Sequence, residues 1–511
     1  MSKKTWVAAA VALVVAGYGA GTWYSGDQTQ KAFADAAAEL RHAVGKEAVV
    51  TETYEKGFFS SQAKWVLEWT PSAPKAEAAE HDGDEVEPAP AAAAPATPPK
   101  PMRLVMNSDI RHGPVAGGKL AAAVVESRFA LEGLDEQAKQ PFAKASMSTL
   151  TGVRHYSGSS DWRFALPAGE AADKGVTVRW ADMAYDVSMA SDQKTIRGEF
   201  KWPELVIAGL SKPAAEEELD LELEEDDEEA ASEAKAAVAA ATPAEQMTIA
   251  VKGMGGSFNT VMIDGLWGVG PGKMQMQAAS AQVINQKADG QPETVAEFKD
   301  ITADTTMEAD AKTLSISNHV KSVGRIGPLA FESLGYEEKI QRLDLDALRS
   351  FQQMLLEGYR QGGLAKALEP SEGQMAALME KSAPQLVAAL PAYQMKLKAS
   401  YQGNAGEVAY GAEVLKAPSA EQVAETGWMP ALLKGSALNA SARLPKAWLA
   451  NIAKASGQEM GPEEIDAMVE MATGTGFARV EGDFLTSNLL VKDGKMNLNG
   501  VLKPLPMGFG E

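Results

Sequence analysis

The pattern of apolar and polar positions begins with one long apolar stretch at the start of the chain. Residues 6–24 (WVAAAVALVVAGYGAGTWY) are nineteen consecutive positions without a charge, preceded by Lys3 and Lys4. A helix of that length reaches roughly 28 Å at about 1.5 Å per residue, close to the ~30 Å hydrocarbon thickness of a bilayer. Because basic flanks resist translocation, the pattern predicts a transmembrane anchor with a cytoplasmic N-terminus.

A cleaved signal peptide shares the basic start and the apolar core, so it stays open as an alternative. Small residues suited to a signal peptidase occur around 17–21, whereas Trp23 and Tyr24 continue the apolar run. Aromatic rings of this kind are typical of a membrane interface, which favours an uncleaved anchor. In both cases we expect the rest of the chain to leave the cytoplasm and to lie in a bacterial periplasm.

After the anchor, the hydrophobic period changes from helical to alternating. Residues 28–44 carry apolar positions at helical spacing and predict a stalk helix, while 48–54 and 63–69 alternate and predict a β-hairpin. Alternating segments at short spacing fill most of the remaining chain, and Asp493-Gly494 between two of them is a strong hairpin signal. Two apolar stripes at helical spacing, within 345–359 and 375–390, predict a layer of amphipathic helices.

Two low-complexity segments interrupt the alternation. One is rich in Ala and Pro, and the other is acidic and rich in Ala, so neither has the apolar mass to pack. The first looks like an insertion in a hairpin tip, because strand patterns resume directly after it. The predicted order is a cytoplasmic tip 1–5, a transmembrane anchor 6–24, a stalk helix and first β-hairpin 25–70, a disordered Ala/Pro-rich insertion 71–101, a β-rich region 102–211, a disordered acidic insertion 212–246, a β-rich region 247–340, a helical layer 341–392 and a mixed strand and helix region 393–511.

The predicted fold class is therefore α+β and predominantly antiparallel β. An N-terminal transmembrane helix is followed by an elongated β-rich periplasmic part with a layer of amphipathic helices.

The chain has no cysteine, so disulfides add nothing to its stability. The net charge of −21 argues against nucleic acid as a partner, because nucleic-acid binding rests on basic patches.

The search for chemistry yields no catalytic, cofactor or metal site. His112 in Arg111–Pro114 is the strongest candidate, but the motif is typical of a strand-ending turn, with no nucleophile or orienting carboxylate at a diagnostic spacing. The acidic run 216–229 holds eleven acids without the spaced ligands of a calcium loop. Gly265–Lys273 lacks the Walker spacing. The other residues considered are the isolated His42, His81, His155 and His319 and the turn residues Ser157, Ser159 and Ser160.

Large apolar residues on the strands predict a sheet with one apolar face. The residues concerned are Trp65, Trp69, Trp162, Trp180, Trp202, Trp267, Met274 and Met276. One interpretation is a core that the helices of 345–390 cover. The other is a concave, partly open apolar face that holds an acyl chain or a partner, since exposed apolar patches mark binding surfaces.

Four segments together resemble the YdgA-like family of bacterial inner-membrane-anchored proteins of unknown function. They are Gly21-Thr22-Trp23-Tyr24-Ser25-Gly26, Tyr54-Glu55-Lys56-Gly57-Phe58-Phe59-Ser60-Ser61, His112-Gly113-Pro114 and Asp493-Gly494-Lys495-Met496-Asn497-Leu498-Asn499-Gly500. The resemblance implies an inner-membrane anchor, a β-rich periplasmic part and self-association into a homo-oligomer. It brings no catalytic residues.

We therefore expect a single-pass inner-membrane protein that is not an enzyme and has no cofactor. Its predicted function is to bind protein partners or a hydrophobic or lipid ligand through a β-sheet surface. One alternative is a self-associating structural spacer or assembly scaffold. Another is an envelope hydrolase around His112 or His155, which would need a nucleophile, a base and an oxyanion site together.

Overall fold

The computed structural model describes residues 25–27, 29–31, 33–34, 38, 49–69, 102–132, 148–173, 175–211, 246–266, 268–286, 291–368, 382–455 and 460–504. The chain divides into two compact units. Unit 1 comprises residues 1–167, 188–193 and 350–379, and unit 2 comprises residues 168–187, 194–349 and 380–511.

The predicted anchor, 6–24, and the predicted insertion 71–101 lie outside the described residues, as does 212–245. Across the part of the chain that is described, no helix combines the length and the apolar character needed to cross a membrane.

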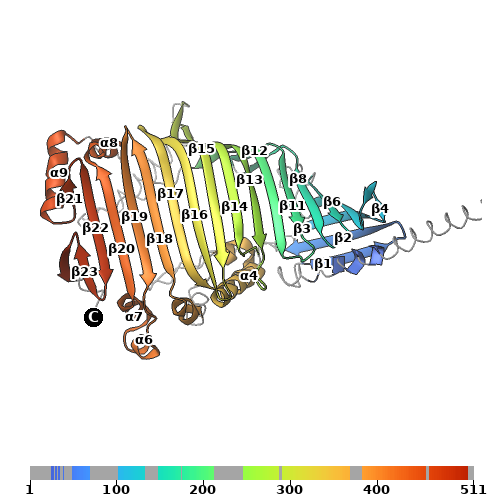
Figure 1. Cartoon of the computed structure of the whole chain (residues 1–511). Coiled ribbons are helices and arrows are strands. Elements are labelled where there is room, and N and C mark those ends of the chain that lie inside the picture. Colours follow the sequence, from blue (N-terminus) through green and yellow to red (C-terminus); the bar gives the residue numbers. More distant parts are fainter. Residues whose placement is uncertain are drawn as a thin grey trace, which may run out of the picture. The chain divides into compact units, whose positions relative to one another are not determined.

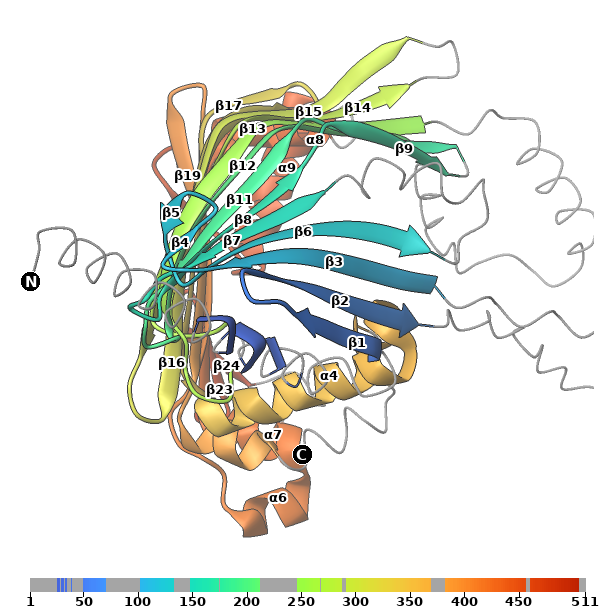
Figure 2. The ribbon, with the colours of Figure 1, turned by 90° about the vertical axis from the view of Figure 1, so that its right-hand side faces the viewer.

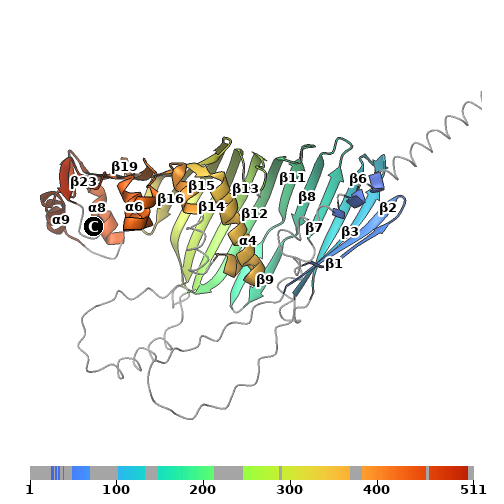
Figure 3. The same cartoon turned by 90° about the horizontal axis from the view of Figure 1, so that it is seen from below.

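Unit 1 contains an antiparallel sheet with the strand order β1–β2–β3–β6–β7–β8. Figure 3 shows β1, β2, β3 and β6 side by side. A small separate hairpin, β4–β5, follows β3. The strands are β1 (Val49–Lys56), β2 (Ser60–Trp69), β3 (Met102–His112), β4 (Val115–Ala116), β5 (Lys119–Leu120), β6 (Ala123–Glu132), β7 (Thr149–Arg154) and β8 (Ser160–Leu166).

The core of unit 1 lies where an N-terminal helix packs on this sheet. The described residues of that helix are 25–27, 29–31, 33–34 and 38. Its Phe33 ring lies 5.3 Å from the Tyr54 ring and 4.9 Å from the Trp65 ring. The buried side chains beneath are Ala63, Ile110 and Ala123.

Unit 2 is built on a longer antiparallel sheet, in which β9, β10 and β12–β20 are followed by β22 (Figure 1). β21 and β23 pair with β22, and β24 pairs with β23. The predicted predominance of antiparallel β structure is thereby confirmed. The strands are β9 (Gly169–Asp173), β10 (Val176–Trp180), β11 (Met183–Met189), β12 (Thr195–Ser211), β13 (Gln246–Val261), β14 (Gly272–Gln286), β15 (Pro292–Ala309), β16 (Thr313–Ile326), β17 (Leu329–Asp344), β18 (Ala392–Tyr401), β19 (Asn404–Val414), β20 (Ser436–Pro445), β21 (Arg479–Glu481), β22 (Phe484–Lys492), β23 (Lys495–Leu498) and β24 (Val501–Pro504).

The predicted hairpin turn at Asp493-Gly494 is present. Both residues have positive φ, 52° and 69°, and Lys492 pairs with Lys495 across the turn. A tight turn that matches the twist of the strands needs positive φ at both central residues. The Asp-Gly pair is therefore what fixes the register of β22 against β23.

The predicted helical layer 341–392 has different limits in the structure, because strand β17 extends to Asp344 and β18 begins at Ala392. Asp344 ends the strand and starts α4 (Leu345–Leu368) by accepting hydrogen bonds from the amides of Asp346 and Ala347, both at 2.9 Å. The remaining helices are α6 (Ala420–Thr426), α7 (Trp428–Lys434), η3 (Lys446–Trp448), α8 (Leu449–Ala455), α9 (Pro462–Gly474) and the helical residues 382–388.

Candidate functional site

The sheet of unit 2 has one apolar face, which follows from its pairing register. Side chains alternate along a strand, and directly paired residues share a face. Successive pairings carry one face from Met276 through Ala303, Val320, Tyr336 and Leu397 to Val408. Over the central strands this apolar face consists of Met254 and Phe258 in β13, Met274 and Met276 in β14, Met307 in β15, Ile316 and Val320 in β16, Tyr336 and Ile340 in β17, Met395 and Leu397 in β18, and Val408 and Tyr410 in β19.

Part of the apolar face remains open to solvent. Leu397 pairs with Val408 and is 45% exposed, while Val408 is 37% exposed. Tyr410, two residues along the same strand, is 41% exposed, as is Met276. Exposed apolar side chains that adjoin one another mark binding surfaces. The second interpretation of the sequence, a partly open apolar face, therefore fits the exposure of these residues.

Other parts of the apolar face are covered. Leu345 and Leu348 of the first turn of α4 pack with Met307, Ile316 and the buried Leu314. On β19, Trp448 of η3 lies over Gly406, where a Cβ would come within 2.6 Å of the indole ring. The glycine is needed at this position because the indole occupies the space of a side chain. Leu397, Val408 and Tyr410 thus lie between two covered regions of the same sheet, whereas Met276 lies on β14, on the other side of β15 and β16.

A row of three paired polar residues, Thr305, Asn318 and Glu338, interrupts the apolar face. Asn318 and Glu338 are paired across β16 and β17, and the Asn318 amide donates a hydrogen bond of 2.7 Å to Glu338. Burial and the adjacent Glu338 raise the pKa of the neighbouring Tyr336 to about 12. The Tyr336 hydroxyl is therefore protonated at neutral pH and can donate a hydrogen bond.

The tryptophans do not all share one face, contrary to the sequence prediction. Trp202 lies on the apolar face with Met274 and Met276. Trp180 pairs with Leu205, which is three positions from Trp202, so Trp180 points to the opposite face. Trp65 and Trp162 belong to unit 1. Trp267 and the side chain of Trp69 lie outside the described residues.

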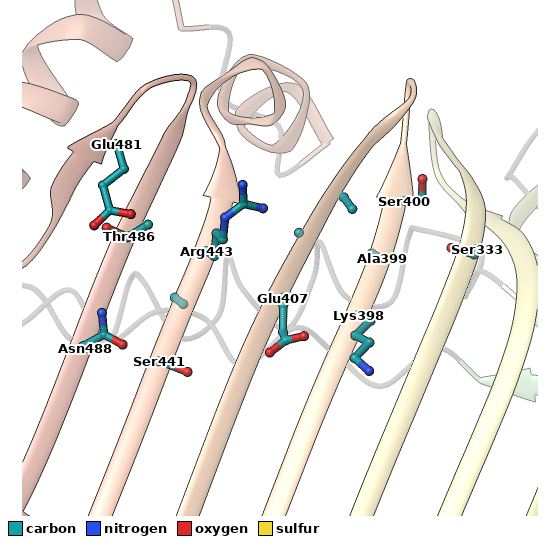
Figure 4. A pocket seen from close by; sticks show the side chains of 13 residues that line it. Ser333, Lys398, Ala399, Ser400, Glu407, Ser441, Arg443, Glu481, Thr486 and Asn488 are labelled. Atoms are coloured by element: carbon teal, nitrogen blue, oxygen red, sulfur yellow. The ribbon is translucent and has the colours of Figure 1, made fainter.

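The opposite face of unit 2 is polar and carries a shallow groove of about 580 Å³. Figure 4 shows Lys398, Glu407 and Arg443 on neighbouring strands there. Their charges are engaged: Lys398 lies 2.6 Å from Glu337, Glu407 lies 3.2 Å from Lys396, and the Arg443 guanidinium stacks 3.3 Å from the centre of the Phe484 ring. Paired charges of this kind suit a solvated surface.

In unit 1, His112 is part of a buried cluster and is not incidental to a turn. It is the last residue of β3 and is 3% exposed. Its Nε2 lies 2.7 Å from the Ser61 Oγ, and among the described residues its Nδ1 has no hydrogen-bond partner. Burial lowers the pKa of His112, and the charge of Lys56 lowers it further. Sequence reasoning missed this pair because Ser61 and His112 are 51 positions apart.

Helical residues 25 and 26 are held against this cluster. The carbonyl of Gly113 accepts hydrogen bonds from the Ser25 hydroxyl, at 3.2 Å, and from the Tyr156 hydroxyl, at 2.5 Å. Gly26 lies against the His112 imidazole, where a Cβ would be 3.5 Å from the ring. The structure thus brings together residues from three of the four segments that carry the family resemblance.

The Ser61–His112 pair provides a hydroxyl and an imidazole, which are two of the groups that a nucleophilic site needs. Catalysis needs a carboxylate that orients the imidazole and a path for substrate. In the described residues the His112 Nδ1 meets no carboxylate, and both side chains are 3% exposed. The pair is therefore suited to joining β2 to β3 beneath helical residues 25 and 26.

The other histidines and serines considered from the sequence do not come together in one site among the described residues. His155 binds Asp161 at 2.7 Å, and the Ser188 hydroxyl donates to the same carboxylate at 2.6 Å. These two hydrogen bonds lower the pKa of Asp161, but the serine contacts the carboxylate and not the imidazole, so the order needed for a nucleophile is absent. Ser157 and Ser159 bind each other, and His319 pairs opposite Glu337.

Gly265–Lys273 connects β13 to β14 and inserts the buried Leu266 into the core of unit 2. Its buried Leu266 gives this loop a structural role. His42, His81 and the acidic run 216–229 lie outside the described residues.

Comparison with known proteins adds a family and no activity. A family model described as a bacterial protein of unknown function (DUF945) matches residues 1–506. No curated protein and no solved structure matches the chain. Because the family model covers nearly the whole sequence, the chain belongs to the DUF945 family.

Proposed function

We propose that this DUF945 protein is a membrane-anchored, non-enzymatic envelope protein that holds lipid acyl chains on the apolar face of unit 2. The observation that carries the proposal is the open part of that face, where Leu397, Val408 and Tyr410 are 37–45% exposed on adjacent strands. Aliphatic and methionine side chains adapt to flexible apolar ligands.

The extent of the apolar face is large enough for two acyl chains end to end. From β13 to β19 there are six strand spacings of about 4.8 Å, so the apolar side chains extend over about 29 Å. This length is similar to the ~30 Å hydrocarbon thickness of a bilayer, across which two acyl chains lie end to end. A ligand lying across the strands along the paired row from Met276 to Val408 would contact apolar side chains on each strand from β14 to β19.

A membrane anchor at residues 6–24 would tether the chain to a source of lipid. The uncharged stretch 6–24 follows Lys3 and Lys4, which favours an inner-membrane span with a cytoplasmic N-terminus. The remaining chain, which has no cysteine, would then lie in the periplasm. Acyl chains of the same membrane are the most abundant apolar ligands at that position.

Photo-crosslinking from the apolar face tests the proposal. The full chain carries benzoylphenylalanine in place of Leu397 or Tyr410 and is reconstituted into vesicles of phosphatidylethanolamine and phosphatidylglycerol. After irradiation we expect adducts with the mass of a phospholipid, because both side chains are exposed on the apolar face. Intact-mass spectrometry measures the adduct.

The matched control is Leu490, which is 42% exposed but lies on the polar face, since it pairs with Asn439. Its benzoylphenylalanine variant should give little or no lipid adduct. Equal labelling at Leu490, or no lipid adduct at Leu397 and Tyr410, would overturn the proposal. A protein-sized adduct at these two positions would instead identify a protein partner.

A self-associating scaffold is the second candidate, because unit 2 also exposes apolar side chains at its C-terminal strands. Phe477 is 64% exposed and Leu502 is 69% exposed, and the ammonium of Lys503, which follows Leu502, lies 5.7 Å from the Phe477 ring. Native mass spectrometry of the detergent-extracted full chain counts the subunits. A single subunit with retained lipid favours the lipid-binding proposal over the scaffold.

A further inference from the structure

The turns at one end of unit 1 expose large apolar side chains. Phe58 is 51% exposed, Phe59 59%, Val115 50%, Leu120 78% and Tyr156 51%. These five residues, which we name the tip surface, come from the β1–β2 turn, the β4–β5 hairpin and the β7–β8 turn. The two phenylalanine rings contact each other edge to face at 4.8 Å.

Strand pairing places the three turns at the same end of the sheet. Ser60, next to the first turn, pairs with Arg111, and His112 pairs with Ala123. Ala123 in turn pairs with Arg154, which precedes the third turn. The Tyr156 hydroxyl closes the group through its hydrogen bond to the Gly113 carbonyl. Figure 2 shows β4 and β5 at this end of β3, β6 and β7.

The charge around the tip surface differs from that of the whole chain. Residues 55–59, 111–122 and 154–161, taken with Asp27, contain four basic residues, Lys56, Arg111, Lys119 and Arg154, and three acids, Asp27, Glu55 and Asp161. The chain as a whole has a net charge of −21. A local basic excess beside exposed aromatic and aliphatic side chains is suited to anionic lipid headgroups.

Ser25, the residue that follows the uncharged stretch in the sequence, lies next to the tip surface. Residues 6–24 are followed by Ser25, which is 1% exposed and donates its hydroxyl to the Gly113 carbonyl. The same carbonyl binds Tyr156 of the tip surface. Asp27 then pairs with Lys56 at 3.0 Å, beside Phe58 and Phe59. A membrane span ending at residue 24 would therefore leave the bilayer at the tip surface.

We infer that the tip surface rests on the lipid bilayer, with Phe58, Leu120 and Tyr156 in the headgroup region and Lys119 against anionic phosphates. This inference depends on the membrane anchor of the proposed function and not on acyl-chain binding by unit 2. The tip surface would fix the orientation of unit 1 relative to the membrane, because three separate turns contact the bilayer together. The buried Ser61–His112 pair joins β2 to β3, and the His112 ring packs against Gly26.

Single-cysteine labelling tests the inference, since the natural chain has no cysteine. Leu120→Cys and Phe58→Cys variants of the full chain carry an environment-sensitive fluorophore and are reconstituted into phosphatidylethanolamine and phosphatidylglycerol vesicles. We expect blue-shifted emission and quenching by lipids brominated near the headgroup. A Glu132→Cys variant, labelled at the opposite end of β6, is the control and should not be quenched.

Charge gives a second readout. Lys119→Gln is expected to lower the ratio of membrane-docked to undocked tip surface, as the label reports it, by about fivefold. Each basic side chain near an anionic surface strengthens binding by about that factor. The effect should disappear in vesicles of phosphatidylcholine alone.

The outcomes separate this inference from the proposed function. If the protein floats with the vesicles but the Leu120 and Phe58 labels are not quenched, the anchor stands and docking is wrong. If the protein does not float, the anchor is wrong and docking falls with it. A blue shift that depends on protein concentration and not on lipid would show that the tip surface binds a second copy, which also overturns the inference.

Discussion

At the scale of single residues, His112 shows how a buried imidazole can hold two strands and a helix together. Its Nε2 binds Ser61, and its ring packs against Gly26 of the N-terminal helix. Burial of the ring without a carboxylate partner disfavours the charged form, which is why the pKa of His112 is lowered from its usual value of 6.5. The neutral imidazole is therefore part of the folded state of unit 1.

This burial predicts that unit 1 loses stability in mild acid. The folded-state pKa of His112 lies below 6.5, so the stabilising contribution is fully present above pH 6.5. It is lost as the pH falls through the folded-state pKa, because the unfolded chain binds a proton that the folded chain does not. Hydrogen exchange of β2 and β3, corrected for intrinsic rates, should show lower protection at pH 5 than at pH 7.

A His112→Gln variant should lose this pH dependence, whatever its absolute stability. His319→Gln, which removes a histidine from β16 in unit 2, should retain it. Equal protection of β2 and β3 at the two pH values in the natural protein would contradict the prediction.

At the scale of elements, β12 and β13 pack by placing aromatic rings over glycines. Gly198 pairs with Phe258, and Phe200 pairs with Gly256, so each ring lies over the glycine of the other strand. A Cβ on Gly198 would lie 2.1 Å from the Phe258 ring, and a Cβ on Gly256 would lie 2.6 Å from the Phe200 ring. The Tyr185 ring stacks on Phe258 at 6.0 Å and restricts where that ring can move.

Gly198→Ala should therefore destabilise unit 2. The added methyl displaces the Phe258 ring, and such overpacking typically costs about 1–3 kcal/mol. Gly335→Ala in β17 is the control, because its Cβ would make an ordinary contact of 3.6 Å with Lys398. That change should be neutral or stabilise by about 0.4–1 kcal/mol. Thermal unfolding of both variants measures the difference, and equal melting temperatures would refute the packing argument.

The alternation of apolar and polar residues was enough to predict most strands of this fold, because half-buried strands require a period of two. It could not predict which residues share a face across the sheet. Trp180 and Trp202 look equivalent in sequence, but the register of β10 on β12 sends them to opposite faces. The Ser61–His112 pair depends likewise on the pairing of β2 with β3, which no local pattern encodes. The first long helix of the predicted helical layer begins at Leu345 and not at residue 341, because Asp344 caps the helix directly at the end of a strand.

At the scale of the whole molecule, the two low-complexity segments connect strands that are already neighbours. Trp69 pairs with Met102 at the end of β2 and β3, and Ser211 pairs with Gln246 at the end of β12 and β13. Each segment therefore closes an antiparallel strand pair, at which a short turn would suffice. Closing a longer loop costs free energy that grows only with the logarithm of its length.

Replacing residues 71–100 and 213–244 by short Asn-Gly turns should thus preserve both units. We expect unchanged circular dichroism and melting temperatures equal to or slightly above those of the natural protein, since each doubling of loop length costs only about 0.6 kcal/mol. The deletions also remove the acidic run 216–229, with its eleven carboxylates. Lipid crosslinking from Leu397 and Tyr410 should therefore persist in the shortened chain, whereas its loss would show that an inserted segment takes part in binding on the apolar face.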